Sequence, residues 1–336
     1  MLLSGLIVQS PHDWQSQLRD VITSRRELLD ILELSENDVG LSSDACKDFA
    51  LKVPRSFVQR MQPRDPRDPL LLQVLSSAQE MIDTPGYSRD PVGERAGVIP
   101  QRGIIHKYHG RALLIVSGGC AVNCRYCFRR HFPYSDNQNS RQQWLEALEY
   151  IRLDHSIEEI ILSGGDPLVI TDEHLRQLVA EIASIPHVKR LRIHSRLPIV
   201  IPERVTPRLL DAITHPRLQT IVVTHCNHAK EIDHAVTAAL KTLCEHNIMT
   251  LNQAVLLKDI NDSVEAQVAL SRALFATGTL PYYLHLLDKV QGAAHFDVPE
   301  SKAHQVMEEV AASLPGYMVP KLVREIAGAN AKVIVK

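Results

Sequence analysis

The stretch ALLIVSGGCAVNCRYCFRRHFP, residues 112–133, joins an apolar segment to a loop that contains three cysteines. Its first part, Ala112–Gly118, is a short run of mostly aliphatic residues bounded by glycine, a pattern typical of a buried strand. The cysteines Cys120, Cys124 and Cys127 follow at once, with the spacing C-x-x-x-C-x-x-C. The sequence therefore predicts a buried strand whose carboxyl end carries a cluster of thiolates.

Further apolar segments after this loop predict strands that alternate with amphipathic helices. Strands separated by helices pair in parallel through right-handed crossovers, so we expect an α/β fold. Such a sheet is either doubly wound or curled into a barrel. Since no seventh or eighth strand is evident, we expect an incomplete (β/α)6 barrel. The six predicted strands are Ala112–Gly118, Glu158–Gly164, Lys189–Ser195, Gln219–His225, Ile248–Leu256 and Leu280–Asp288.

The same pattern divides the chain into three regions. Residues 1–105 are predicted to form an N-terminal, mainly helical region packed on the barrel, with one helix over Asp13–Leu34. Residues 106–299 are predicted to form the barrel core. Residues 300–336 contain a C-terminal helix and a final segment with Lys332 and Lys336.

The composition is that of a globular protein. Hydrophobic residues make up 45% of the 336 residues and charged residues 23%. The net charge of −2 and the aromatic content of 5% argue against nucleic acid or an acidic membrane as a partner. No apolar run has the length of a membrane span, and the start MLLSGLIVQSPHDW lacks the basic leader of a secretory signal. Six cysteines in so long a chain predict no disulfide framework, so we expect a cytoplasmic protein.

Polar residues gather at the carboxyl ends of the predicted strands. In parallel α/β folds the active site lies at this edge of the sheet. The distribution therefore predicts one site there, independently of any single motif. The residues concerned are Cys120, Asp166, Arg196, His225, Asn227 and Asp288.

Three cysteines at this spacing also indicate a metal site. Thiolates suit both iron–sulfur clusters and zinc. A structural zinc site needs a fourth close Cys or His, and His131, four residues after Cys127, is a candidate. We favour an iron–sulfur cluster and keep zinc as the alternative.

A wider set of segments carries the same pattern along most of the chain, from about Leu51 to Lys332. These segments are HKYHGRALLIVSGGCAVNCRYCFRRHFP, LSGGDPL, RLRIHSRLPIVIPERVT, THCNHAKEID, LNQAVLLKDIND and PYYLHLLDKVQGAAHF. Together they resemble the lysine 2,3-aminomutase family of radical S-adenosylmethionine (SAM) enzymes. The resemblance implies that the three cysteines hold a [4Fe–4S] cluster whose fourth iron binds SAM and whose electron generates a 5′-deoxyadenosyl radical. It also implies pyridoxal 5′-phosphate (PLP), held by a lysine, as the carrier of the migrating amino group.

Within that family the motifs are most similar to the branch that serves (R)-β-lysylation of elongation factor P. The resemblance implies an isomerase (EC 5.4.3.-) that converts (S)-α-lysine to (R)-β-lysine, which a dedicated ligase attaches to elongation factor P. The implied partners are free L-lysine, a reduced electron donor of the flavodoxin or ferredoxin type, and, functionally, that ligase. One alternative is a catabolic lysine 2,3-aminomutase that gives (S)-β-lysine. The other is a non-catalytic iron–sulfur or zinc module, which would not need the polar strand ends.

The resemblance also assigns roles to residues at the substrate. Lys332, in the segment REIAGANAK, is the implied PLP lysine, with Lys336 as its competitor. Arg129 matches the arginine that binds the substrate carboxylate. Asp288 matches one of two aspartates that bind the ε-ammonium group. Glu325 stands at the position of the second aspartate, and a surface acid is its alternative interpretation.

Further residues match the family's cofactor contacts. Those implied to contact the PLP phosphate, or alternatively to form an ordinary basic strand entry, are Lys107, Tyr108 and Arg111. Those on the loop implied to contact the methionine amino group of SAM are Gly164, Gly165 and Asp166. A plain turn would give the same Gly-Asp-Pro motif. Those implied to line the cofactor cavity are Arg192, His194, His225 and Gln253.

Overall fold

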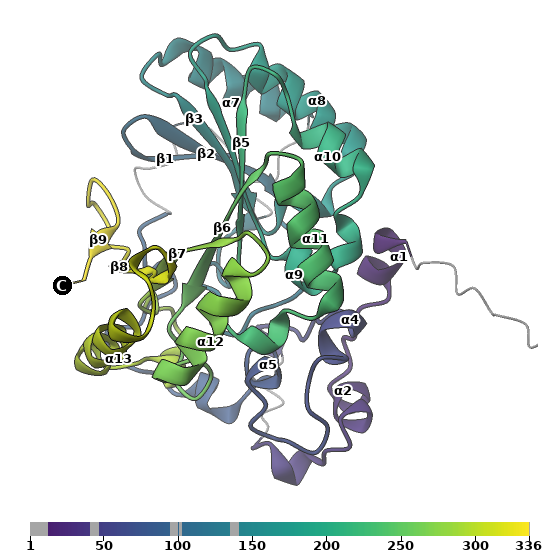
Figure 1. The fold of residues 1–336 in the computed structure, drawn as a ribbon, viewed down its shortest axis with the longest axis vertical. Helices are drawn as coiled ribbons and strands as arrows, with labels where there is room; N and C mark the ends of the chain where they lie inside the picture. Colours follow the sequence, from purple (N-terminus) through teal and green to yellow (C-terminus); the bar gives the residue numbers. More distant parts are fainter. Residues whose placement is uncertain (1–12, 41–46, 95–99, 101–102, 135–140, 336) are drawn as a thin grey trace, which may run out of the picture.

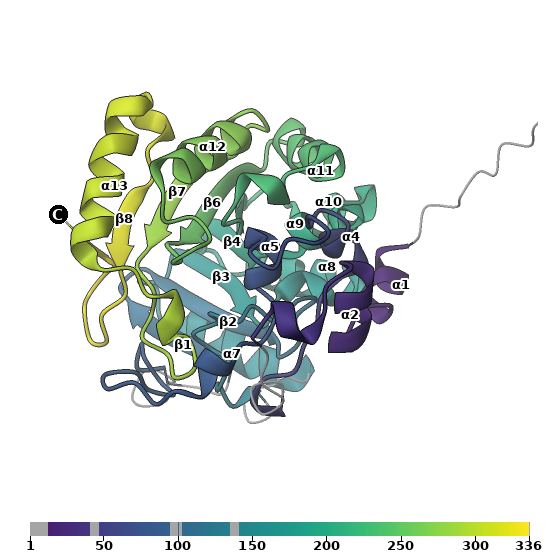
Figure 2. The same ribbon diagram turned by 90° about the horizontal axis from the view of Figure 1, so that it is seen from below.

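The computed structural model describes residues 13–40, 47–94, 100, 103–134 and 141–335. These residues form one nine-stranded sheet in the order β1 to β9, and the strands lie in an arc (Figures 1 and 2). The strands β2 to β8 are parallel, and β1 and β9 pair antiparallel at the two edges. The strands are β1 (Ile104–Tyr108), β2 (Arg111–Ser117), β3 (Glu159–Gly164), β4 (Arg190–Ser195), β5 (Gln219–Thr224), β6 (Met249–Val255), β7 (Leu280–His285), β8 (Lys321–Arg324) and β9 (Val333–Ile334).

Helices connect the parallel strands and lie outside the arc (Figure 2). Their first turns are capped by side chains that accept backbone N–H groups, as Thr171, Asp233 and Ser263 do. No helix within the described ranges is long and apolar enough to cross a membrane. The longer helices are α7 (Arg141–Leu153), α8 (Asp172–Ala183), α10 (Pro207–Ile213), α11 (His234–Glu245), α12 (Val264–Phe275) and α13 (Glu300–Ser313).

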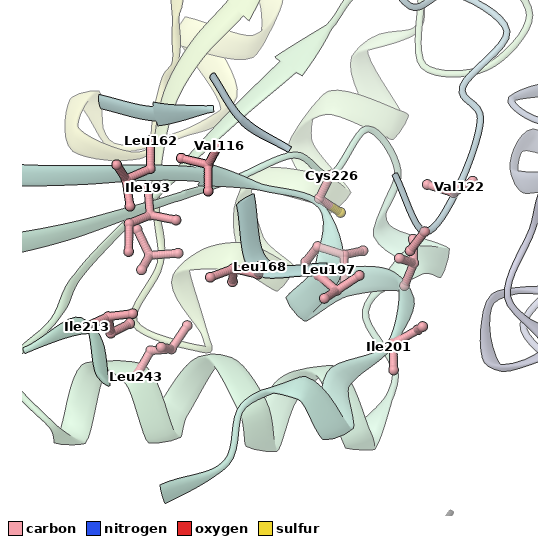
Figure 3. Packing of buried hydrophobic residues seen from close by; sticks show 14 of the residues in the cluster. Val116, Val122, Leu162, Leu168, Ile193, Leu197, Ile201, Ile213, Cys226 and Leu243 are labelled. Atoms are coloured by element: carbon pink, nitrogen blue, oxygen red, sulfur yellow. The ribbon is translucent and has the colours of Figure 1, made fainter. Parts of the chain in front are cut away.

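The main core lies between the strands and these helices. Figure 3 shows Leu162 of β3 and Ile193 of β4 in the same cluster as Ile213 of α10 and Leu243 of α11, all buried. In β4 the buried residues alternate with less buried ones. Because alternate residues of a strand point to opposite faces, the outer face of the sheet packs on the helices. The inner face is left for polar side chains.

The α/β fold class is confirmed, and the parallel part of the sheet has one more strand than the six predicted. The additional strand, β8, pairs in parallel with β7. It has four residues and a burial pattern without alternation, so its sequence carries too little periodicity to identify it. The strand brings the residues after Arg324 to the same edge of the sheet as the other strand ends.

The predicted helix over Asp13–Leu34 is wrong. Two short helices, α1 (Trp14–Arg19) and α2 (Arg25–Ile31), occupy this segment. Between them Ile22 forms an isolated β-bridge, and Ser24 caps α2. The intervening residues are mostly β-branched and favour extended backbone, which the apolar spacing alone did not reveal. In addition, β1 starts at residue 104, so the predicted boundary after residue 105 falls inside a strand.

Candidate active site

A cavity of about 620 Å³ opens at the carboxyl ends of the parallel strands. Its volume is within the range typical of small-molecule sites. Every residue predicted to have a catalytic, cofactor-binding or metal-binding role lines this cavity, although the role of each stays a prediction. These residues are Lys107, Tyr108, Arg111, Cys120, Cys124, Cys127, Arg129, Gly164, Gly165, Asp166, Arg192, His194, His225, Gln253, Asp288, Glu325 and Lys332. Asn227, predicted at the same edge, is fully buried and is not among the lining residues.

The cysteine loop follows β2 and is held by backbone hydrogen bonds. The N–H of Cys127 donates to the carbonyl of Cys124 at 3.0 Å, and the N–H of Arg125 donates to the carbonyl of Gln73 at 2.9 Å. The three thiols are free and partly buried. Burial raises the pKa of Cys127 to about 11 and also raises the pKa of Cys120. A metal that binds here must therefore displace thiol protons.

The arrangement of the thiols fits a cluster better than a single zinc ion. Zinc needs four ligands around one point, whereas each cysteine of a [4Fe–4S] site binds a different iron. Within the described residues, no three Cys, His, Asp or Glu side chains are placed to hold one ion. The Nε2 atom of His131, the candidate fourth zinc ligand, lies 3.3 Å from the carbonyl oxygen of Gln291 instead.

Two glycines at the end of β3 lie against the start of the cysteine loop. Gly164 has a φ of +118°, and a Cβ there would lie 2.5 Å from the carbonyl oxygen of Ser117. A Cβ at Gly165 would overlap the carbonyl oxygen of Gly119. A hydrogen bond from the N–H of Gly165 to the carbonyl of Ser117, at 2.7 Å, stabilises this close approach. Both positions therefore require glycine.

The carboxylate of Asp166 is fully engaged by the protein. It accepts hydrogen bonds from the hydroxyl of Ser195 at 2.8 Å and from the N–H groups of Leu168, Arg196 and Leu197 at 3.0, 2.8 and 3.1 Å. Burial raises the pKa of Asp166. Its side chain thus links the end of β3 to the end of β4.

Glu80, in the N-terminal region, clamps the cysteine loop and was not identified from the sequence. Its carboxylate accepts from Nε of Arg125 at 2.8 Å and from Nη2 of Arg130 at 2.9 Å. All three side chains are buried, with 1% of the Glu80 side chain exposed. Both guanidinium groups also stack on the ring of Phe49. The local sequence signal for Glu80 was a capping box with Ser77, which predicts a turn and not this contact.

Lys332 and Glu325 both line the cavity and contact each other. The amine of Lys332 donates to Oε2 of Glu325 at 2.8 Å, the hydroxyl of Tyr108 donates to the same carboxylate, and the amine of Lys107 lies 3.6 Å away. Burial opposes ionisation of Glu325, but the charge and hydrogen bond of Lys332, together with the contacts of Tyr108 and Lys107, lower the pKa of Glu325 overall. The alternative interpretation of Glu325 as a surface acid is wrong, because only 10% of its side chain is exposed.

Arg129 is oriented by a carboxylate that the sequence did not reveal. Its Nε and Nη2 atoms donate to Glu94 at 2.7 and 2.8 Å, and Nη1 donates to the hydroxyl of Ser163 at 3.2 Å. Glu94 also lies 3.6 Å from the amine of Lys107. A bidentate pair of this kind fixes the plane of the guanidinium group. Glu94 lies 35 residues before Arg129, in a loop without a recognisable motif.

Two neutral histidines, His194 and His225, line the cavity. Nδ1 of His225 donates to the carbonyl of Gln253 at 3.1 Å, so its Nε2 accepts from the hydroxyl of Tyr126 at 2.8 Å. Burial lowers the pKa of His225 to about 3 and also lowers that of His194. Among the described residues, Nε2 of His194 has no hydrogen-bond partner. That atom is therefore available to a ligand.

Asp288, after β7, has a carboxylate without a protein partner. No hydrogen bond or ion pair joins its side chain to another described residue. Burial raises the pKa of Asp288 to about 7, although the charge of Lys332 acts in the opposite direction. A partly buried carboxylate with a raised pKa in a cavity is a candidate binding group for a cation, because a nearby positive charge would favour its ionised form.

Comparisons with known proteins agree with this geometry. Residues 114–266 match the family model of the radical SAM superfamily. The chain is 51% identical to the L-lysine 2,3-aminomutase of Escherichia coli (strain K12) over 324 residues, which are 96% of this chain and 94% of that protein. It is 46% identical to the L-lysine 2,3-aminomutase of Haemophilus influenzae over 329 residues, or 98% of this chain and 97% of that protein.

The chain belongs to the lysine 2,3-aminomutase family. Among solved structures it is similar to a radical SAM methyltransferase from Sphaerobacter thermophilus, with 15% identity, a TM-score of 0.46, and coverage of 66% of this chain and 68% of that chain. As a lysine 2,3-aminomutase family member it is an isomerase that uses a [4Fe–4S] cluster, SAM and PLP. When bound, these groups supply a carbon-centred radical and a carrier for the migrating nitrogen.

The residues of this aminomutase cavity fit those groups. Three thiols without a fourth close ligand match a cluster with one open iron. Several buried polar atoms of residues that line the cavity have no hydrogen-bond partner in the described part of the chain, among them Nε of Arg192, Nε2 of His194 and Nε2 of His285. Since buried polar atoms are rarely left unpaired, these atoms are expected to contact the bound groups.

The replacement Glu80→Gln is expected to impair cluster assembly in this aminomutase. It would remove the buried carboxylate charge that the guanidinium groups of Arg125 and Arg130 share, at a cost of about 3 kcal/mol. The iron content after anaerobic reconstitution and the melting temperature should both fall. The matched control is Glu33→Gln, because Glu33 pairs with Arg64 at the exposed surface, where such a pair contributes at most about 1 kcal/mol. Wild-type iron content and melting temperature in Glu80→Gln would contradict the role of Glu80 in holding the cysteine loop.

Proposed function

We propose that the protein converts free (S)-α-lysine to (R)-β-lysine for the β-lysylation of elongation factor P in the cytoplasm. The observation that carries the choice of substrate is the carboxylate of Asp288, which has no partner among the described residues and shares one cavity with Arg129. Lysine offers an α-carboxylate to a guanidinium group and a distal ammonium group to a carboxylate. An amino acid with a neutral side chain would leave Asp288 unpaired.

The residues around the substrate have distinct proposed roles. Arg129, held in plane by Glu94, binds the α-carboxylate. Asp288, which matches one of the two aspartates of the family pattern, and Glu325, at the position of the second, bind the ε-ammonium group. Because Glu325 contacts Lys332, it also orients the amine to which PLP is proposed to bind.

The remaining residues of the cavity are proposed to hold the cofactors. The thiolates of Cys120, Cys124 and Cys127 would bind the cluster. Lys107, Tyr108 and Arg111 would bind the phosphate of PLP, as cations and hydroxyls do. The contacts proposed for SAM are Gly164, Gly165, Asp166, Arg192, His194, His225 and Gln253.

The (R) product and the link to elongation factor P rest on the likeness of the sequence motifs to that branch of the family. A reduced flavodoxin or ferredoxin is the proposed electron donor. Reconstitution with iron, sulfide, PLP, SAM and L-lysine under anaerobic conditions, followed by chiral analysis, tests the proposal. (R)-β-lysine that the elongation factor P ligase accepts is the expected product. (S)-β-lysine would identify a catabolic enzyme instead, and a protein that binds zinc and makes no β-lysine would refute the aminomutase.

The replacement Asp288→Asn is expected to raise the KM for lysine about 10- to 100-fold, since it removes a charge-assisted contact to the ammonium group. In the wild type, Asp288 is ionised above a pKa of about 7, so KM should fall as the pH rises through neutrality. This pH dependence should be much weaker in the variant, and its iron content should equal that of the wild type. A KM equal to the wild-type value at high pH would remove Asp288 from the substrate site.

The same variant also tests how Asp288 affects folding stability, and the direction of the change in melting temperature follows from its pKa. The folded pKa of Asp288 lies above the ordinary value of 3.8, so folding stability from this group is lost as the pH rises from the unfolded to the folded pKa. The ligand-free Asp288→Asn protein should therefore melt at a higher temperature than the wild type near pH 8. The difference should vanish at low pH.

A further inference from the structure

A buried arginine contacts the central cysteine of the loop. Arg196 follows β4 and is 6% exposed. Its Nη1 atom donates hydrogen bonds to Sγ of Cys124 at 2.7 Å and to the hydroxyl of Tyr126 at 2.8 Å. From the sequence, Arg196 was only one of several polar residues at the strand ends. The contact places a full positive charge against a sulfur atom that is expected to bind iron.

Other buried groups hold the guanidinium group in this place. Its Nη2 atom donates to the side-chain oxygen of Gln73 at 2.6 Å and to Oε2 of Glu231 at 3.1 Å. Gln73 and Glu231 are fully buried. The backbone N–H of Arg196 donates to Asp166 at 2.8 Å, and the guanidinium carbon lies 5.3 Å from the centre of the Phe57 ring. These contacts hold the guanidinium group beside Cys124.

Glu231 is itself anchored by backbone groups. Its Oε1 atom accepts from the N–H groups of Asn227 and His228 at 2.9 and 3.1 Å, and from the amide of Gln73 at 3.1 Å. The charge of Arg196 lowers the pKa of Glu231, although burial acts in the opposite direction. Glu231 is thus a buried anion that is paired with Arg196, and Arg196 in turn contacts the sulfur of Cys124. It partly offsets the positive charge that the sulfur experiences.

We propose that Arg196 is a positioning residue that raises the reduction potential of the cluster bound by Cys124, and that Glu231 limits this effect. An electron added to an iron–sulfur cluster increases the negative charge on its sulfur ligands. A cation or N–H donor at such a ligand stabilises the reduced form more than the oxidised form, which raises the potential. The effect is large where water is excluded, because charges interact more strongly there.

The proposal predicts shifts of opposite sign in two neutral variants. Arg196→Gln removes the positive charge and should move the midpoint potential of the reconstituted cluster to a more negative value. Glu231→Gln leaves the guanidinium charge uncompensated and should move the potential to a more positive value. Arg196→Lys keeps the charge but not the forked geometry, so its potential should lie between those of Arg196→Gln and the wild type.

The experiment is a redox titration of the reconstituted full-length protein, followed by electron paramagnetic resonance, with iron and sulfide content measured for each variant. Arg204→Gln is the matched control. Arg204 is also fully buried, but it donates to the carbonyls of Leu168 and Ile170 and pairs with Asp172. This control should keep the wild-type potential.

Three outcomes would overturn the proposal. One is an unchanged potential in an Arg196→Gln protein with full iron content. Another is a shift of the Arg196 and Glu231 variants in the same direction. The third is loss of the cluster from both variants while Arg204→Gln retains it, since this would show that the pair only maintains the loop.

Discussion

Replacement of Lys332 by alanine is expected to abolish both PLP binding and the formation of β-lysine. Activity should fall at least about a thousandfold, as it does when a covalently reacting residue is removed from other enzymes. The amine of Lys332 lies 2.8 Å from Glu325 and lines the same cavity as Arg129 and Asp288. No substitute amine is expected from Lys107, which donates to the carbonyl of Val92 at 2.9 Å.

The measurement is PLP content and the visible absorption of bound PLP, together with β-lysine formation. The control is Lys336→Ala, since Lys336 is the competing lysine in the sequence and lies outside the described residues. The control should bind PLP and form β-lysine as the wild type does. If Lys332→Ala retained the PLP absorption and Lys336→Ala lost it, the assignment would pass to Lys336.

Replacement of Cys124 by alanine is expected to abolish the cluster and all turnover. A [4Fe–4S] cluster with one open iron has three protein ligands, and the remaining two cannot hold it in a cavity open to ligands. Cys124 also accepts the hydrogen bond from Arg196, so the variant leaves a buried guanidinium group with one partner fewer. Iron content should fall from about four atoms per chain to near zero, with loss of the brown colour.

Cys244→Ala is the matched control, because Cys244 is a partly buried cysteine of α11 whose sulfur contacts Thr250 and Thr277. The control should retain the cluster and turnover. A colourless wild-type protein with one bound zinc, lost in Cys124→Ala, would show that the loop is a zinc site. Full iron content in Cys124→Ala would show that the cluster lies elsewhere.

Much of the fold was predictable because its signals are local. The apolar runs of β2 and β3 and the alternation in β4 lie within single strands, where side-chain period and burial are directly linked. The polar residues at the strand ends were expected at one edge for the same reason, and all of the residues with a predicted catalytic, cofactor or metal role line one cavity there, whereas Asn227 does not. The strand β8 and the break between α1 and α2 were missed. The four residues of β8 and the β-branched segment between α1 and α2 are too short for a periodic pattern to identify their structure.

The ion pairs of the site were not predictable, because their partners lie far apart in the chain. Glu80 precedes Arg125 by 45 residues, Glu94 precedes Arg129 by 35, and Arg196 precedes Glu231 by 35. Each of these acids resembles an ordinary surface acid in the sequence. Only the folded chain brings each of them within hydrogen-bond distance of its arginine.

The sequence by itself determined the α/β class, the three cysteines with their spacing, and the set of residues at the carboxyl edge. It did so because these features depend on residue type and local period. The tertiary structure alone decided which carboxylates are paired, which is left for a ligand, and which cysteine meets a guanidinium group. These depend on distance and on exclusion of water, since both set the strength of an electrostatic contact. Asp288 is left for a ligand because its side chain has no partner within the described chain. Cys124 differs from the other two cysteines of the loop because its sulfur accepts a hydrogen bond from Arg196.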